Sequence, residues 1–301
     1  MKTGLIRVDI GIPAYNEELT IARVIADVLK QRGNEWVLNR IFVYSDGSTD
    51  QTNSIVKRIS RQRIQLVSNP VRKGIATAIN ALIRQSSSDI LILLDADIVI
   101  PSESFIQEFV HTFKTSPNIG LVGARVEPLP PKTFIESVLN ESHRVKTLFY
   151  EAMVPHSIYL CHGRALGFRK KLYKKLSYPQ IIADDAYAYV RTKEESLEFR
   201  YVKKATVQFR NPATITDHIK QSIRFNTGRA QIQTVFSNYD ISAFYRLPVF
   251  PMIFVWTRWL LKRPVSAVTY LALYLYCAAA VKVRTGSIKN IWEISLSTKR
   301  I

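Results

Sequence analysis

Cysteine is scarce in this sequence, and acidic residues are too few to balance the basic ones. The two cysteines, Cys161 and Cys277, lie far apart in the chain. They therefore provide neither a disulfide framework nor a cluster of thiolate metal ligands. Residues 1–8 contain no apolar run long enough for the core of a signal peptide, so we expect the N-terminal part to stay in the cytoplasm.

The common glycine-rich phosphate-binding motifs are also missing. The sequence has neither a G-x-x-x-x-G-K-[ST] loop nor a G-x-G-x-x-G turn after its first expected strand, which argues against P-loop kinases and dinucleotide-dependent oxidoreductases. It shows no zinc-finger spacing and no aromatic RNA-recognition pattern, so nucleic acid is not an expected partner. The histidines show no repeated metal-ligand spacing, which favours structural roles for most of them.

The charge is the strongest compositional feature. The chain has 42 lysines and arginines against 24 aspartates and glutamates, which gives a formal net charge of +18. Such an excess indicates a polyanionic partner, for example nucleic acid, an acidic lipid surface or a phosphorylated substrate. Composition alone does not choose among these partners, and a soluble basic protein without any of them is also consistent with it.

The N-terminal half alternates short apolar runs with helical patterns. We expect strands at residues 6–12, 41–44, 64–67 and 90–94. Ile21, Val24, Ile25, Val28 and Leu29 lie at helical spacing, and a further helix is expected over residues 74–84. The run at 90–94 is apolar throughout, as in a central strand buried on both faces. These features predict an α/β fold with a mainly parallel central sheet flanked by helices.

Polar clusters at residues 13–18, 45–50 and 95–97 follow three of these strands. Ligands of open α/β sheets bind beyond the carboxyl ends of the strands, so the clusters are expected to converge on one crevice. From about Val126 the βα pattern gives way to a proline-rich loop, a long mixed segment and an expected helix over residues 214–236. This second half is expected to bind a second substrate.

The C-terminal region, residues 237–301, changes character again. Residues 247–261 are aromatic and aliphatic but interrupted by Pro248, Pro251 and Arg258, and residues 265–281 carry no charge. That uncharged run is at the short limit for crossing a bilayer, so a spanning, an interfacial and a buried helix all remain open. Tryptophans and tyrosines between basic residues suit a membrane interface. We therefore expect helices here that associate with an anionic membrane surface.

Several residues in the polar clusters suit nucleotide chemistry. Asp95 and Asp97 stand one residue apart after the buried strand, where two carboxylates can hold a hard divalent cation and the cation can hold a diphosphate. An acidic turn is the alternative, because aspartate is common in loops. Tyr15 offers an aromatic face and Asp46 an acceptor, the two contacts that a base such as uracil uses. Each of them alone could equally be structural.

Taken together, four ordered segments resemble the motifs of family 2 glycosyltransferases. They are Ile12-Pro13-Ala14-Tyr15-Asn16-Glu17-Glu18, Asp46-Gly47-Ser48-Thr49-Asp50, Lys73-Gly74 with Ala78 and Asn80, and Asp95-Ala96-Asp97. The resemblance covers Arg7 to about Gly228. It implies the GT-A fold, a nucleotide-sugar donor and Mg²⁺ or Mn²⁺, in a domain at residues 1–236 with a donor half to about residue 125 and an acceptor half at about 126–236.

The resemblance also implies roles for single residues. The nucleotide-sugar would be bound by Pro13, Ala14, Tyr15, Glu17, Asp46, Lys73, Asp95, Ala96 and Asp97. Asp97 would be the firmest metal ligand, and Asp95 would contact the ribose or the metal. Gly163 and Arg164 fall in a segment similar to the family's acceptor-side glycine-and-basic segment.

Ala183-Asp184-Asp185 is similar to the family's Glu-Asp pair, whose second acid is the catalytic base. Such a base removes the proton of an acceptor hydroxyl while it attacks the anomeric carbon, which inverts the configuration. Asp185 is therefore the first choice for the base and Asp184, which replaces the usual Glu, the second. Asp184 could also cap a helix over residues 186–190.

Gln221, Arg224 and Phe225 look like the Gln-x-x-Arg-Trp motif of polymer-forming members, with Phe in place of Trp. Arg224 would meet the diphosphate, and the aromatic ring would stack on an acceptor sugar. Because Phe lacks the indole N–H, the change weakens the case for polymerisation. Ordinary helix packing is the alternative for Phe225.

The sequence thus predicts an inverting, metal-dependent hexosyltransferase at the cytoplasmic face of the cell membrane. Its donor would be a UDP-sugar first and a GDP-sugar second, and its acceptor a hydroxyl of a lipid-linked or cell-surface glycan. A catalytically inactive GT-A-like membrane scaffold is one alternative. A sugar nucleotidyltransferase is another, although it would need a glycine-rich basic loop where residues 13–18 are acidic.

Overall fold

The structure is a computed structural model that describes residues 4–59, 62–284 and 296–299. Its strands are β1 (Ile6–Ala14), β2 (Trp36–Asp46), β3 (Ile64–Asn69), β4 (Ile90–Leu94), β5 (Ile119–Pro128), β6 (Ala165–Arg169) and β7 (Glu198–Phe209). Its α-helices are α1 (Ile21–Leu29), α2 (Thr52–Ile59), α3 (Ile75–Gln85), α4 (Phe105–Thr115), α5 (Phe134–Met153), α6 (Lys170–Tyr173), α7 (Asp184–Glu194), α8 (Ile215–Val235), α9 (Val249–Lys262) and α10 (Pro264–Arg284). Short 3-10 helices are η1 (Ile158–Leu160), η2 (Ile241–Tyr245) and η3 (Leu296–Lys299).

The strands of the described chain form one sheet in the order β3-β2-β1-β4-β6-β5-β7. β6 runs antiparallel to its neighbours β4 and β5, and the other adjacent pairs are parallel. The predicted mainly parallel sheet is therefore confirmed, and β4 has the predicted bounds. β2 begins earlier than predicted, because Asn39 and Arg40 break the apolar pattern before the buried run that starts at Ile41.

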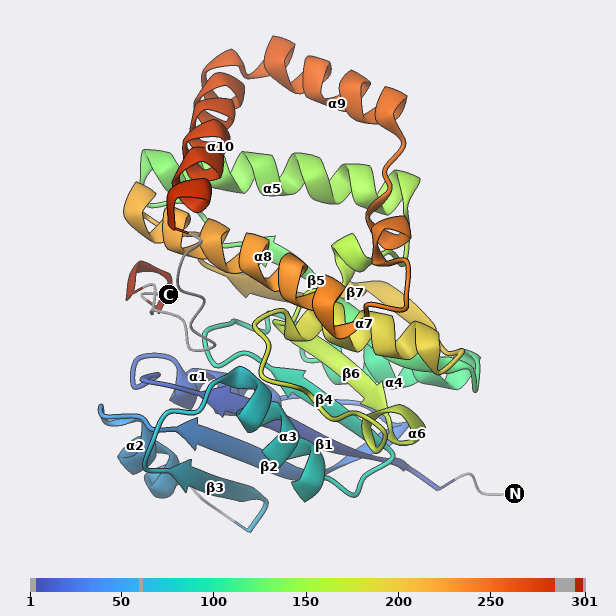
Figure 1. Cartoon of the computed structure of the whole chain (residues 1–301). Helices are drawn as coiled ribbons and strands as arrows, with labels where there is room; N and C mark the ends of the chain where they lie inside the picture. Colours follow the sequence, from blue (N-terminus) through green and yellow to red (C-terminus); the bar gives the residue numbers. More distant parts are fainter. Residues whose placement is uncertain (1–3, 60–61, 285–295, 300–301) are drawn as a thin grey trace.

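Helices cover both faces of the sheet (Figure 1). One hydrophobic cluster joins α1, α2 and α4 to the sheet, and a second joins α3, α6 and α7 to its other face. The predicted apolar stripe of α1 is buried at Ile21, Val24, Ile25 and Val28. Leu29, predicted in the same stripe, is 44% exposed at the end of that helix. Both faces of β4 are buried, as its uninterrupted apolar sequence predicts.

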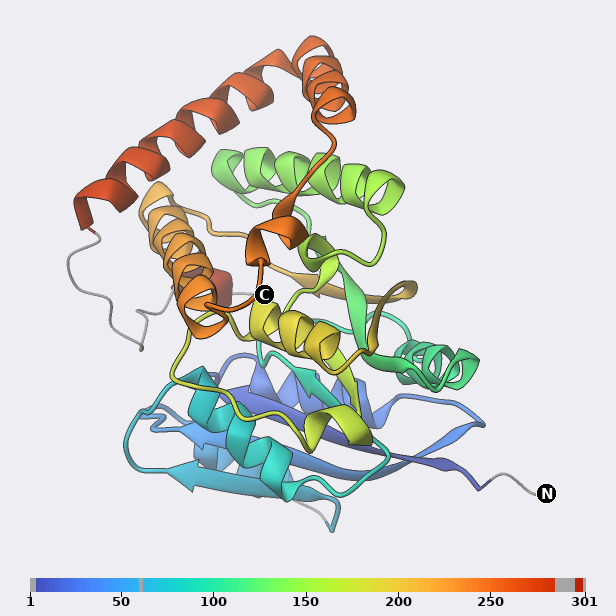
Figure 2. The ribbon, with the colours of Figure 1, turned by 45° about the vertical axis from the view of Figure 1, so that its right-hand side comes forward.

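A further helical layer consists of α5, α9 and α10, with α9 on the side of α5 that is turned away from the sheet (Figure 2). Trp259 of α9 is buried, and its indole N–H donates to Glu141 of α5 at 3.4 Å. Many other large apolar side chains of α9 and α10 are exposed. Among the described residues, no helix combines the length and the apolar character that crossing a membrane requires.

Candidate active site

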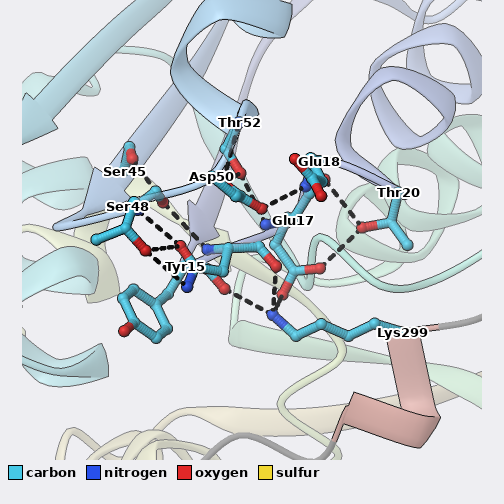
Figure 3. A network of polar contacts seen from close by, with 11 residues as sticks. Tyr15, Glu17, Glu18, Thr20, Ser45, Ser48, Asp50, Thr52 and Lys299 are labelled. Carbon is cyan, nitrogen blue, oxygen red and sulfur yellow. Dashed lines mark hydrogen bonds and ion pairs between the residues drawn. The ribbon is translucent and has the colours of Figure 1, made fainter.

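The loops after β1 and β2 lie together, as the polar clusters predict, and hydrogen bonds join them (Figure 3). The amide N–H of Asn16 donates to the hydroxyl of Ser48 at 3.1 Å, and the N–H of Thr49 donates to Oδ1 of Asn16 at 2.8 Å. Asn16 has a left-handed backbone, with φ of 53°, which asparagine tolerates better than most residues. The third cluster is close as well: burial raises the pKa of Glu17, and the nearby charge of Asp97 also raises it.

Asp46 lies at the end of β2, and its carboxylate binds the main chain. Oδ1 accepts from the N–H of Lys73 at 2.9 Å, and Oδ2 accepts from the N–H of Gly74 at 2.7 Å. Gly47 makes this approach possible: its φ is +73°, and a Cβ there would lie 2.6 Å from the backbone nitrogen of Arg72. Asp46 thus fixes the loop before α3.

The ring of Tyr15 has a cation against it in this structure. The guanidinium carbon of Arg72 lies 3.8 Å from the ring centroid, within the range of a cation–π contact. Ala14 and Ala96, which were also predicted to bind the nucleotide-sugar, are buried in the hydrophobic core. Their side chains are therefore not exposed to a ligand. Pro13 is half-buried, and the side chain of Lys73 is exposed.

Asp95 and Asp97 follow β4 directly, beside the start of β6. The N–H of Asp95 donates to the carbonyl of Arg164 at 2.9 Å, which joins the two segments. Burial, together with the charge of Asp97, raises the pKa of Asp95 to about 6, although the guanidinium groups of Arg164 and Arg224 act to lower it. Two carboxylates that repel each other in a partly buried place suit a divalent cation, which would relieve that repulsion.

The chemistry of these donors fits Mg²⁺ or Mn²⁺. Carboxylate oxygens are the hard ligands that both ions prefer, and ions of this kind usually take further oxygens from substrate phosphates and water. Among the described residues there is no group of three or more His, Cys, Asp or Glu side chains that could hold a metal. A cation at Asp95 and Asp97 would therefore depend on the diphosphate of a bound nucleotide for the rest of its ligands.

Asp184 and Asp185 lie in the first turn of α7, and they differ in their surroundings. The carboxylate of Asp185 accepts from the N–H of Ala186 at 2.7 Å and from the backbone of Gly163. Burial, followed by the charges of Asp185 and Asp95, holds the pKa of Asp184 well above its ordinary range. Burial also raises the pKa of Asp185, but its hydrogen bonds and Arg224 lower it. Of the pair, Asp185 is therefore better suited to carry the charge.

The prediction that Asp184 caps this helix is wrong. The residue before the first turn is Ala183, and it has no side-chain cap. Asp184 is instead the first helical residue, and its carboxylate is turned toward Gly163. A Cβ at Gly163 would lie 3.1 Å from Oδ2 of Asp184. Gly163 thus leaves the room that the acid needs beside the start of β6.

Two arginines bring positive charge to the acids. The guanidinium of Arg164 lies 3.9 Å from the ring centroid of Phe209, and its charge interacts with those of Asp95, Asp97 and Asp185. Arg224 of α8 interacts with Asp95, Asp184 and Asp185. Arg164 and Arg224, both predicted on the acceptor side, therefore lie within electrostatic reach of the acids that follow β4 and begin α7.

The remaining residues of the α8 motif lie in different surroundings. Gln221 is half-buried one turn before Arg224. Phe225 is 56% exposed, so it does not pack in the core. Its ring lies 5.6 Å from the guanidinium carbon of Arg224. An exposed ring beside a cation remains available for stacking on a sugar.

A small pocket connects the two groups of acids. Its lining includes Pro13, Leu93, Leu94, Asp95, Gly163 and Asp184. The pocket thus has walls from β1, β4 and the segment before β6, with one acid from β4 and one from α7.

Two residues of this site were missed from the sequence. Arg72 stands next to the motif residue Lys73. A second basic residue at this position could have indicated a contact with a nearby aromatic ring, such as that of Tyr15. Lys299 gave no signal, because it lies 284 residues from Tyr15 in the chain. Its ammonium nevertheless donates to the carbonyl of Tyr15 at 2.6 Å and to Oε1 of Glu17 at 2.6 Å.

Comparison with known sequences agrees with this geometry. A sequence model described as glycosyl transferase family 2 matches residues 9–177, more than half of the chain. A poly-beta-1,6-N-acetyl-D-glucosamine synthase of Staphylococcus epidermidis is 24% identical over 233 residues, which cover 73% of this chain and 54% of that protein. A UDP-Glc:alpha-D-GlcNAc-diphosphoundecaprenol beta-1,3-glucosyltransferase of Escherichia coli is 39% identical over 90 residues, 30% of this chain and 34% of that protein. The chain matches about half or less of the length of these relatives.

Solved structures share the fold. A mannosyltransferase from Pyrobaculum calidifontis, in complex with GDP-Man and Mn²⁺, superposes with a TM-score of 0.62 at 18% identity, covering 96% of this chain and 78% of that one. A glucosyl-3-phosphoglycerate synthase from Mycobacterium tuberculosis, in complex with Mn²⁺, UDP and glucosyl-3-phosphoglycerate, gives a TM-score of 0.55 at 19% identity, covering 76% and 79%. At such low sequence identities, the similarity to these two structures shows a shared fold alone.

Proposed function

The chain belongs to glycosyl transferase family 2, and from that membership and the site geometry we propose that it is an inverting, metal-dependent hexosyltransferase. It transfers a sugar from a nucleotide-sugar, a UDP-sugar before a GDP-sugar, to a hydroxyl of a lipid-linked or cell-surface glycan. Tyr15 and Asp46 suit a uracil base, and the E. coli relative is named for a UDP-glucose donor and a diphosphoundecaprenol acceptor.

One observation carries this proposal. The acids that follow β4 and the acids that begin α7 lie within electrostatic reach of one another and of Arg164 and Arg224. The loops that suit a nucleoside adjoin the first pair of acids, and Asp184 of the second pair lines the small pocket together with Asp95. A sugar held between them would have its diphosphate near Asp97 and its anomeric carbon within reach of a base on α7.

The chemistry follows from this arrangement. Asp185 takes the proton of the acceptor hydroxyl as its oxygen attacks the anomeric carbon, and the bond from that carbon to the diphosphate oxygen breaks. The nucleoside diphosphate leaves from the opposite face, so the configuration inverts. Burial and the charges of Asp185 and Asp95 hold the pKa of Asp184 well above its ordinary range, which makes it the less suitable base of the pair. The guanidinium groups of Arg164 and Arg224 stabilise negative charge that develops in the transition state.

The metal has a defined part in this proposal. Asp97 and Asp95 would hold Mg²⁺ or Mn²⁺, which when bound offsets the charge on the departing nucleoside diphosphate. The solved relatives contain Mn²⁺ together with GDP-Man or UDP. That supports a divalent cation at these two residues.

A donor screen tests the proposal. The purified full chain is incubated with UDP-glucose, UDP-N-acetylglucosamine or GDP-mannose, with membrane extract as acceptor, and release of the nucleoside diphosphate is measured with Mn²⁺, Mg²⁺ or EDTA. We expect turnover of one donor, a UDP-sugar, that requires the metal. Asp185→Asn is expected to abolish it.

A matched control and two contrary results complete this design. Glu103→Gln removes an exposed acid before α4, away from the site, and is expected to leave turnover unchanged. Absence of both turnover and binding for every donor would favour the inactive scaffold. Release of pyrophosphate from a nucleoside triphosphate and a sugar phosphate would favour the nucleotidyltransferase.

We also propose that the chain works at the cytoplasmic face of the cell membrane, with α9 and α10 on an anionic lipid surface. An apolar face on these helices includes Phe250, Phe254, Leu261 and Val265, which are 86%, 66%, 78% and 66% exposed. Exposed basic residues lie beside it at Arg258, Lys262 and Arg263. Large exposed apolar side chains next to basic ones suit the interface of an anionic bilayer.

Vesicle sedimentation tests this contact. Binding to phosphatidylcholine vesicles with and without phosphatidylglycerol is compared for the wild type and for Phe250→Ser combined with Leu261→Ser. We expect at least a tenfold loss of binding, because each side chain buried in lipid contributes about 1.5–3 kcal/mol. Leu5→Ser, which changes an apolar residue 54% exposed at the other end of the chain, serves as control. Equal binding of the double variant and the wild type would refute the proposal.

A further inference from the structure

The C-terminal segment returns to the loop after β1, at the place proposed for the nucleoside. The ammonium of Lys299 in η3 donates to the carbonyl of Tyr15 at 2.6 Å, to the carbonyl of Asn16 at 2.8 Å and to Oε1 of Glu17 at 2.6 Å (Figure 3). An ammonium has three N–H donors, so these contacts use all of them. Lys299 therefore acts on the protein loop and has no N–H left for a phosphate.

A second contact ties the same segment to the opposite side of the site. The hydroxyl of Ser297 donates to Oδ2 of Asp217 at 2.5 Å and accepts from the N–H of Ala213 at 3.3 Å. Asp217 lies in the first turn of α8, the helix that carries Arg224. The segment from Ser297 to Lys299 thus connects the loop that carries Tyr15 with the helix that carries Arg224.

The contact with Glu17 is buried. Side chains of Lys299 and Glu17 are 12% and 10% exposed, so water screens their attraction only weakly. Glu17 also accepts from the hydroxyl of Thr20 at 2.8 Å, and its own N–H donates to Thr52 at 2.7 Å. Loss of the ammonium would leave a buried carboxylate without its counter-ion, beside the charge of Asp97. The loop would then relax away from the shape that it has here.

We infer that Lys299 is a positioning residue for the donor nucleoside, holding the loop of Tyr15, Asn16 and Glu17 in the shape that the nucleoside binds. This inference rests on the proposed function, because it takes the loop as the nucleoside site. The segment is a brace across the site: the ammonium contacts main-chain carbonyls and a buried acid of the loop, and the acids of β4 and α7 are not among its partners. Loss of the brace lowers affinity for the nucleotide and spares the chemical step.

The test compares full-length Lys299→Met and Lys299→Arg with the wild type. Binding of UDP and GDP with Mn²⁺ is measured by calorimetry, and KM and kcat are measured for whichever donor the wild type uses. We expect Lys299→Met to raise the nucleotide Kd and the donor KM about tenfold, as for loss of charged hydrogen bonds, with kcat changed less than twofold. Lys299→Arg should recover part of the affinity. Lys204→Met, at an exposed lysine of β7, should match the wild type.

Two results would overturn the inference. Unchanged Kd and KM in Lys299→Met would show that the loop keeps its shape without the brace. Tighter binding or faster turnover would show that the segment obstructs the site. If Lys299→Met does not fold, as judged by circular dichroism, Ser297→Ala tests the same brace from its other end, with the same expected rise in Kd. A wild type that binds nucleotide but turns over no donor would refute the proposed function and leave this inference intact.

Discussion

The donor side of the site, formed by the loops after β1, β2 and β4, is held largely by hydrogen bonds. The facing side, formed by α7, α8 and the segment before β6, is dominated by charges that act on one another. Asn16 meets Ser48 and Thr49 through amide and hydroxyl groups. Asp184, in contrast, interacts with the charges of Asp185, Asp95 and Arg224. Asp185 accepts backbone hydrogen bonds and interacts with the charges of Arg224 and Arg164. Hydrogen bonds thus fix the shape of the donor side, as binding of a substrate requires. The interacting charges of the facing side set its electrostatic environment, as proton transfer requires.

Lys299 and Glu17 add an ion pair to the donor side. It is buried in the loop after β1, which hydrogen bonds also hold. The contrast between the two sides therefore implies different consequences of substitution: loss of turnover on the facing side, and loss of stability or affinity on the donor side.

The largest effect is expected on the facing side, from Asp185→Asn. Asparagine keeps the shape but does not take a proton, so kcat should fall about 10³-fold, within the range for a general base. The donor KM should change little. Asp184→Asn should reduce kcat less than tenfold, because burial and the neighbouring acids already favour its protonated form. Initial rates at saturating donor measure both variants. A larger loss in Asp184→Asn than in Asp185→Asn would reverse the assignment of the base.

A smaller effect, on stability, is expected on the donor side from Asn16→Ala. The substitution removes the side-chain hydrogen bonds to Thr49 and places alanine at a φ of 53°. Together these should cost about 2 kcal/mol of the free energy of unfolding. Asn16→Gly loses the same bonds without the backbone strain, so its loss should be about 1 kcal/mol smaller. Urea denaturation compares the two. Equal losses would show that the left-handed backbone at this position carries no cost.

Much of the donor side could be predicted from the sequence. Apolar runs and helical spacing placed β1, β3 and β4 and their following loops, and Asp95 and Asp97 follow β4 as expected. The positions depend on local patterns and on the parallel arrangement of adjacent strands. Asp46 was placed at the right strand end, but its hydrogen bonds to Lys73 and Gly74 were not foreseen, because they depend on the close approach of two loops at Gly47.

The facing side was less predictable. Its acids and arginines were found through a resemblance, and their mutual burial depends on where β6, α7 and α8 pack. Asp184 was expected before the helix and lies inside it, because Ala183 provides the non-helical residue instead. The role of Lys299 could not be predicted, because its partner Glu17 lies 282 residues away in the sequence and no local pattern links the two.

The last effect concerns the pH dependence of stability. Two buried histidines near Arg164 on the facing side, His143 and His162, act in the opposite direction to Glu17 on the donor side. Burial lowers the pKa of His162 to about 3 and that of His143 to about 4. The unfolded chain therefore takes up protons below pH 6.5 that the folded chain does not, and these groups reduce stability as the pH falls. Burial raises the pKa of Glu17 to about 7. Between about pH 7 and 4.5 the folded chain binds that proton, so Glu17 favours folding as the pH falls.

Substitutions separate the two contributions. On going from pH 7 to pH 5, His162→Gln should lose less stability than the wild type, and Glu17→Gln should lose more. Urea denaturation at both pH values measures this, with His111→Gln, at a side chain 67% exposed, as control. The opposite signs follow from which state holds the proton: the unfolded chain for a buried neutral histidine, and the folded chain for a buried acid. Changes of the same sign in the two variants would mean that the two sides do not differ in this way.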